Sequence, residues 1–291
     1  MEIAMTRKAK AIDFRRGGRL YSASALLLML FLLAACAAPG GQRALGDGAG
    51  DDTLTGHRYL GPIQARDIGP IELGGHPPMR YRMTETGEPP EAMVVERRKL
   101  GATIRESQTF ITDDAELTLM VTRATNGPVY GVDLESVEMA SGEPFDEEEI
   151  RELQSSLPSI GGALGDMQSA VLGKPLVVGE LYVWDINDSV NALVQSLADA
   201  AGDPGMTFDA SSRYLGITRT AEGEAAVFRD VGSGTVDMDG GNLTYYAAGW
   251  RLIDRDTGAL IEQDWRMKTE YPMSGQTQTI YSEERIELVD D

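Results

Sequence analysis

The sequence predicts an α+β protein that is mostly antiparallel β, with two β-meanders forming a curved sheet or half-barrel and two or three helices between or over them. Two runs of segments alternate apolar and polar residues with the period of two that is typical of half-buried strands. Short turns rich in Gly, Asp and Asn separate neighbouring segments, which is the spacing of antiparallel hairpins. A stretch with helical spacing lies between the two runs.

The first run predicts one meander. In residues 115–124, apolar side chains at every second position alternate with Glu116, Thr118 and Thr122, which indicates a strand with one buried face. Sequences such as Asn126-Gly127-Pro128 have turn chemistry. The expected strands of this meander are 79–86, 92–99, 102–112, 115–124 and 129–139.

The middle of the chain predicts two helices and a linking strand over 176–185. Asp146 can cap a helix whose first turn is acidic, as the helix dipole favours, and Pro158 is expected to end that helix. Apolar residues at helical spacing over 190–201 predict the second helix. The glycine cluster 161–165 follows no strand and lacks a Lys-Ser/Thr ending, so we interpret it as a helix–helix connection rather than a phosphate loop.

The second run predicts another meander, with strands at 207–220, 224–238, 243–253, 259–271 and 276–289. The alternation is clearest in the fourth of these strands. One face is expected in the core and carries Ile261, Trp265, Met267 and Tyr271. The other is expected in water and carries Glu262, Asp264, Arg266, Lys268 and Glu270. The two meanders form an approximate pseudo-repeat with halves 79–175 and 176–291.

The N-terminal residues predict export and a lipid anchor. Residues 1–35 combine a basic region with an uncharged apolar core over 25–33, which is too short for a bilayer-spanning helix. Leu33-Ala34-Ala35-Cys36 then closes the segment as a lipobox. The segment resembles bacterial lipoprotein signal peptides. The resemblance implies cleavage after Ala35, a diacylglyceryl thioether on Cys36, and usually a third acyl chain such as palmitate on the freed amine.

Three alternatives stay open for this segment. Cys36 is the only cysteine and has no internal disulfide partner, which argues against an ordinary signal peptide that happens to end in cysteine. Translation starts at Met1 or Met5, and export uses the Sec route or, given Arg15-Arg16, the twin-arginine route. Ala37 stands where an Asp would favour retention at the inner membrane. The expected location is therefore the bacterial cell envelope, lipid-anchored at the outer membrane and facing the periplasm.

The mature chain is expected to consist of a spacer and one folded domain. Residues 36–78 are assigned to a flexible tether and an irregular lead-in, because residues 37–56 are rich in glycine and have no apolar period. Twenty such residues reach roughly 25 Å, which lifts the domain off the lipid surface. Residues 79–291 are assigned to a single β-rich domain.

The charge of the chain excludes nucleic acid as a partner. The net charge is −20, and removing the signal, with its six basic and two acidic residues, leaves 20 Lys+Arg against 44 Asp+Glu, or −24. Phosphate backbones are bound by clustered cations, which this composition lacks. The membrane is expected to be reached through acylated Cys36 alone.

The sequence predicts no enzyme, cofactor or metal site. A nucleophilic triad needs a general base, and the two histidines, His57 and His76, lie in the tether and lead-in without a Ser or Cys motif nearby. They are also too few for a histidine-based metal site. The turns 237–242 and 254–258 hold several carboxylates but match no full calcium loop, so we interpret them as hairpin turns.

The order of tether, meander, helices and meander resembles exported curved-sheet β-lipoproteins of the lipoprotein-localisation-factor type and the mycobacterial glycolipid-carrying lipoproteins. Segments 175–181 and 250–261 are similar in style to such proteins. The resemblance implies a non-enzymatic binding module that holds a hydrophobic or lipid ligand. The alternative is a structural lipoprotein that acts through contacts with envelope proteins. Three tryptophans, expected in the core, bear on this choice: Trp184, Trp250 and Trp265.

Replacing Cys36 with serine tests the anchor. The Cys36→Ser protein has no thiol to acylate, so we expect it to be released from membranes or to stay as an uncleaved precursor. Fractionation of cells into membrane and soluble material, followed by mass measurement of the chain, checks this. Normally processed Cys36→Ser protein in the membrane fraction would falsify the anchor.

Overall fold

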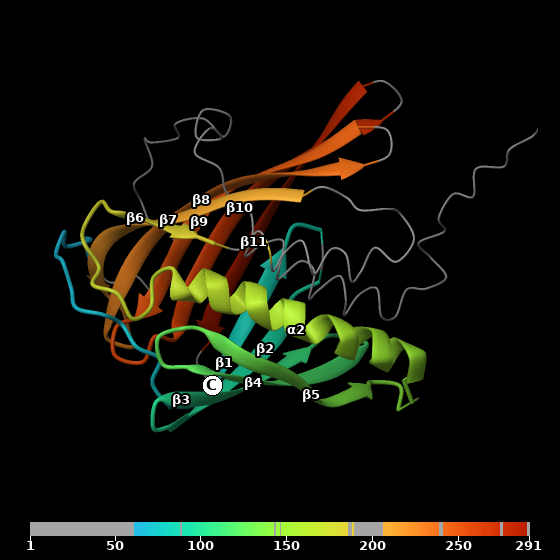
Figure 1. Ribbon diagram of the computed structural model, residues 1–291, viewed down its shortest axis with the longest axis horizontal. Coiled ribbons are helices and arrows are strands. Elements are labelled where there is room, and N and C mark those ends of the chain that lie inside the picture. The colour runs from blue at the N-terminus through green and yellow to red at the C-terminus, as the bar shows by residue number, and fades with distance from the viewer. Residues whose placement is uncertain are drawn as a thin grey trace, which may run out of the picture.

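The computed structural model describes residues 61–289, except for Glu88, Glu143, Asp146 and residues 186–187, 189–205, 239–240 and 274–275. Strands make up most of this part of the chain, and one long helix interrupts them (Figure 1). The elements are β1 (His76–Glu85), β2 (Glu91–Leu100), β3 (Thr103–Ile111), β4 (Ala115–Ala124), β5 (Val129–Met139), α2 (Glu147–Ser169), β6 (Leu181–Trp184), β7 (Met206–Arg219), β8 (Glu224–Met238), β9 (Gly241–Asp254), β10 (Leu260–Met273) and β11 (Gln276–Val289).

All eleven strands belong to one antiparallel sheet that is not closed into a barrel, in the order β5-β4-β3-β2-β1-β11-β10-β9-β8-β7-β6. Each meander is built from neighbouring hairpins. The two meanders join where β1 pairs with β11, in register from Arg80 opposite Val289 to Glu85 opposite Glu284. The edges of the sheet are therefore β5 and β6, the two strands that flank α2 in the chain.

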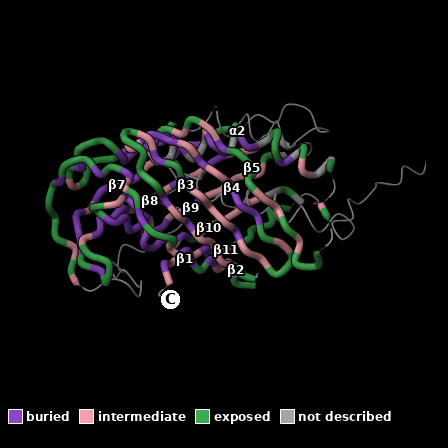
Figure 2. Tube along the Cα trace, turned by 90° about the horizontal axis from the view of Figure 1, so that it is seen from below, coloured by how far each residue is buried: buried purple, intermediate pink, exposed green. Residues whose placement is uncertain are grey.

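The sequence-based strands are confirmed, as is the mostly antiparallel β class. Four of them, 115–124, 129–139, 224–238 and 276–289, match β4, β5, β8 and β11 residue for residue. The linking strand expected over 176–185 is shorter and spans only β6. Alternation located these strands because buried and more exposed positions alternate along much of their length, as Figure 2 shows along the chain; in β8 both faces are buried over 225–228.

The expectation of two or three helices is not supported, since α2 is the one helix in the described ranges. The helix expected over 190–201 and the capping residue Asp146 lie outside the described residues. Pro158 does not end the first helix, which continues to Ser169. Proline removes one backbone donor from the helix, but the Pro158 side chain is exposed, so its ring does not displace the buried face of α2.

The glycines that we interpreted as a connection lie inside α2 and let it pack closely on β5. A Cβ atom on Gly161 would lie 2.7 Å from a methyl group of Val132. One on Gly165 would lie 2.8 Å from the backbone nitrogen of Val129. Real Cβ atoms do not approach that closely. The spacing Gly-x-x-x-Gly is thus a helix face, and its role is contact with β5.

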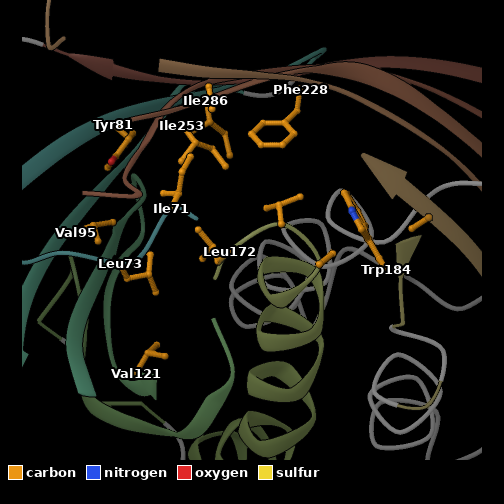
Figure 3. Close-up of a cluster of buried hydrophobic side chains, with 14 of the residues drawn as sticks. Ile71, Leu73, Tyr81, Val95, Val121, Leu172, Trp184, Phe228, Ile253 and Ile286 are labelled. Atoms are coloured by element: carbon orange, nitrogen blue, oxygen red, sulfur yellow. The ribbon is translucent and has the colours of Figure 1, made fainter. Parts of the chain in front are cut away.

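Most buried side chains lie between the sheet and the elements inside its curve. Figure 3 shows side chains from both meanders and from the segment after α2 gathered beside the helix. Residues 61–75, which have no regular secondary structure, add Ile68, Ile71 and Leu73 to this cluster. Gln64 and Ile68 each form an isolated bridge, to Ile217 and Leu176. The lead-in therefore packs as part of the core.

Two tryptophans meet across the inside of the curve. Trp184 of β6 and Trp265 of β10 stack with ring centroids 6.1 Å apart, and each is only 2% exposed. Gly249 of β9 makes room for this stack, since a Cβ there would lie 2.0 Å from Trp265 Cδ1. The prediction that these two tryptophans are core residues is confirmed. Trp250 is half-buried on a smaller cluster.

The predicted faces of β10 are right in its middle and wrong at its start. Trp265 lies in the main core and Arg266 is exposed, as expected. The pairing of β10 with β9 shifts by one residue between Leu260 and Glu262. This bulge moves Ile261 to the smaller cluster on the opposite face, and Glu262 is buried rather than in water. The side chain of Tyr271 lies outside the described residues.

Replacing Trp265 with alanine tests the packed interior. The substitution removes a fully buried ring from a stack, so we expect the free energy of unfolding to fall by about 3–5 kcal/mol. Arg266→Ala is the matched control, because its ion pair with Glu283 is exposed, and we expect a change within about 0.5 kcal/mol. Denaturant unfolding measures both. A larger loss for Arg266→Ala than for Trp265→Ala would show that the strand faces the other way.

Candidate functional site

A buried ionic cluster occupies the inner face of the first meander. The Glu106 carboxylate on β3 accepts hydrogen bonds from Arg97 on β2 and Arg123 on β4, and all three side chains are buried. Arg123 also donates to Gln168 near the end of α2, and Arg97 donates to the Gly258 carbonyl at 3.2 Å. The cluster therefore ties the helix and the β9–β10 turn to the sheet.

The charges of this cluster stabilise one another. Burial alone would raise the pKa of Glu106, but the positive charges of Arg123 and Arg97 outweigh it and hold the pKa at about 2. His76, the first residue of β1, lies nearby, and burial lowers its pKa. Its Nδ1 hydrogen-bonds the Pro77 carbonyl at 2.8 Å. The cluster is a structural lock, since its carboxylate and both guanidinium groups are already engaged.

A second polar cluster lies inside the other meander. Arg251 of β9 pairs with Asp230 of β8 at 3.1 Å and donates to the Ser212 hydroxyl at 2.9 Å. The same hydroxyl accepts the indole N–H of Trp184 at 2.9 Å. The Arg251 guanidinium also lies 5.5 Å from the ring centroids of Trp184 and Phe228. These contacts hold the short strand β6 against the sheet.

Glu284 is a buried carboxyl group whose surroundings disfavour its ionised form. It faces Glu85 across the β1–β11 pair, and its side chain is buried with only Gln263 donating to it, at 3.4 Å. Burial, and then the charge of Glu85, raise the pKa of Glu284 well above its usual range. The ionised form is therefore destabilising in the folded protein.

A pocket of about 510 Å³ lies beside β6. This volume is within the roughly 300–1,000 Å³ of small-molecule sites. Its lining is polar and apolar in about equal parts and comes from the segment after α2 and from β6: Ala170, Lys174, Pro175, Val177, Glu180, Leu181, Tyr182 and Val183. It is the best candidate for a binding site in the described part of the chain.

The pocket borders the free edge of β6. Leu181, Tyr182 and Val183 all line it, and consecutive residues of a strand point to opposite faces. A pocket that touches all three must therefore run along the edge of the strand. Tyr182 fixes the opposite wall, since its hydroxyl donates to the Pro175 carbonyl at 3.0 Å and accepts the Val177 amide at 2.9 Å.

Apolar side chains around this pocket are open to solvent. Val183 is 70% exposed, Leu181 49% and Val177 43%. Single exposed apolar residues are common, but three that line one pocket form a patch of the kind that marks an interaction site. We call these three residues and the pocket the β6 site.

The sequence-predicted site residues lie elsewhere. Cys36 and His57 are outside the described residues, as are residues 239–240 of the turn 237–242. In the turn 254–258, the Asp254 carboxylate accepts the backbone amides of Asp256 and Thr257 at 3.2 and 2.7 Å, so it caps the turn. The sequence analysis missed the β6 site. The signal was present in Leu-Tyr-Val-Trp, a strand with no charged residue.

Two kinds of feature are absent from the described ranges. No group of three or more His, Cys, Asp or Glu side chains there could hold a metal ion. No helix in those ranges is long and apolar enough to cross a membrane.

Comparisons with known proteins found no relative. No protein-family model, no curated protein and no solved structure matches this chain.

Replacing Glu106 with glutamine tests the ionic lock. The change leaves two buried guanidinium groups without their carboxylate, so we expect a loss of about 3–5 kcal/mol at pH 7. Because folding lowers the pKa of Glu106 to about 2, its contribution is complete above the unfolded pKa and disappears as the pH falls through the folded value.

The difference in unfolding free energy between the two proteins should therefore shrink between about pH 5 and pH 2. Urea unfolding at several pH values measures it. Glu116→Gln, at an exposed position of β4, is the control and should have little effect. A difference that is small at pH 7, or that does not change with pH, would contradict the lock.

Proposed function

We propose that this protein is a membrane-anchored lipoprotein of the bacterial envelope that acts as a non-enzymatic binding module. Acylated Cys36 tethers it, and residues 37–56 carry the domain away from the lipid surface. The binding surface is the β6 site, which holds a hydrophobic group of the ligand.

The observation that carries this proposal is the pocket at the edge of the sheet together with the exposed apolar side chains beside it. It combines a volume suited to a ligand with a lining from Pro175, Val177, Leu181 and Val183. Removing exposed apolar surface from water is favourable by about 25 cal/mol per Å². A hydrophobic group that enters the pocket gains this contribution.

The polar groups of the pocket favour binding over catalysis. The Tyr182 hydroxyl is engaged with Pro175 and Val177, and burial raises its pKa, so it is a poor proton donor or nucleophile. Lys174 donates to the Ala170 carbonyl at 3.2 Å. The lining also holds a hydroxyl–carboxylate contact, in which Tyr182 donates to Glu180 at 3.3 Å, but the raised pKa of Tyr182 means that this contact does not activate the hydroxyl as a nucleophile.

The second candidate is a scaffold that works through protein–protein contacts. It is favoured by the exposure of Leu181 and Val183 on an edge strand, because such edges pair with other chains. The two candidates share the β6 site and differ in the chemistry of what occupies it.

A charge placed in the pocket tests the binding proposal. We expect an environment-sensitive apolar dye to bind the unacylated Cys36→Ser chain with increased fluorescence. Adding Val183→Asp should weaken that binding at least about tenfold, because a carboxylate in the lining disfavours an apolar guest. The matched control is Tyr281→Asp, at another exposed position. Dye binding that survives Val183→Asp unchanged would overturn the assignment of the site.

A further inference from the structure

Among the described residues, the backbone of β6 is paired on one side only. Strand order ends at β6, which pairs with β7 from Leu181 opposite Arg213 to Trp184 opposite Ala210. The Tyr214 amide donates to the Glu180 carbonyl, so the backbone of Glu180 faces β7. Backbone groups alternate between the two sides of a strand, so those of Tyr182 and Trp184 face β7 as well. The N–H and C=O groups of Leu181 and Val183 therefore point away from the sheet.

These outward groups are accompanied by apolar side chains. Leu181 and Val183, the residues with outward backbone groups, are also the two exposed apolar side chains of β6. Within the described ranges, no further hydrogen bond is formed by their backbone. An edge that offers free donors and acceptors together with apolar side chains is a template for another strand.

The other edge of the sheet is protected. Helix α2 packs on β5 through Gly161 and Gly165, and β5 carries three exposed acidic residues, Asp133, Glu135 and Glu138. The pairing of β4 with β5 also contains two register shifts, which disturb an edge. Charges, bulges and covering elements are the usual protections of edge strands, whereas Leu-Tyr-Val-Trp of β6 has no charge and no proline.

The charged residues at the two ends of β6 indicate which charge a strand bound there should carry. Glu180 and Asp185 flank the strand, and both are exposed. The net charge of the whole chain is −20. An added strand with a basic residue near each end would meet complementary charges, whereas an acidic one would be repelled.

We propose that β6 receives an extended segment of a partner protein, which adds to the sheet as a further antiparallel or parallel strand. The segment carries apolar side chains at alternate positions, which cover Leu181 and Val183 and fill the pocket, and a Lys or Arg near each end. This inference rests on the proposed function, because it names the ligand of the β6 site as polypeptide rather than free lipid.

A synthetic peptide tests the backbone pairing. The probe is acetyl-Lys-Thr-Val-Thr-Val-Thr-Lys-amide, and its control has the same side chains with the three central amides N-methylated. Methylation removes the donors on both edges of the peptide, so we expect binding to the unacylated Cys36→Ser chain to fall at least tenfold. Isothermal titration calorimetry measures both affinities.

Two variants test the pairing from the protein side. Val183→Pro removes one of the two N–H groups that point outward and leaves the bonds of β6 to β7 intact, so it should reduce peptide affinity at least tenfold. Val183→Ala keeps that N–H and should lose distinctly less. Near-ultraviolet circular dichroism and thermal unfolding establish that both variants are folded. If Val183→Pro does not fold, the N-methylated peptide still decides the question.

Every outcome separates the alternatives. Equal binding of the plain and N-methylated peptides, or equal affinities of the two variants, would overturn strand addition. Binding of the apolar dye without binding of the peptide would overturn this inference and leave the proposed function standing, with lipid as the ligand. A dimer that Val183→Pro dissociates would show that a second copy takes the edge and would also overturn it. Failure of both dye and peptide would reject the β6 site itself.

Discussion

The pairing of β1 with β11 is the constraint on which the rest of the structure depends. It joins the first strand of the described chain to the last, and so turns two separate meanders into one sheet. Once that pair forms, the strands on either side of α2 become the two edges. Helix α2 then lies inside the curve, where it packs on β5, and the segment that follows it leads to β6 (Figure 1). The position of the β6 site is thus a consequence of topology.

The packing inside the curve of the sheet depends on both the size and the charge of the side chains there. Gly249 gives the space in which Trp184 and Trp265 stack, and the ion pair of Arg251 holds β6 next to them. On the other wall, Glu106 and its two arginines hold the helix. These groups make a closed interior, in which Glu284 is retained at a cost in stability at neutral pH. The proposed binding therefore falls at the edge of the sheet, where apolar side chains are exposed.

Much of this fold could be predicted from the sequence, and less of the site. Strands such as 115–124 were found because a strand with one buried face must alternate, and that requirement is local. The prediction that the helix ends at Pro158 was wrong. The helix continues past the proline because Gly161 and Gly165 pack closely on β5, and this is a tertiary contact. Ile261 was misplaced because a bulge depends on the partner strand. Likewise, the four residues of β6 predict an apolar strand. They do not predict that this strand lies at an edge, because its position in the sheet is decided by the distant β1–β11 pair.

The proposals for the β6 site require β6 to be an open edge of the sheet, and amide hydrogen exchange of single residues tests whether it is. In the isolated protein, the amides of Tyr182 and Trp184 face β7 and should exchange slowly. The amides of Leu181 and Val183 point away from the sheet and should exchange orders of magnitude faster, at rates near those of an exposed loop. Equal protection of all four amides would contradict the account, because it would mean that the edge is already covered.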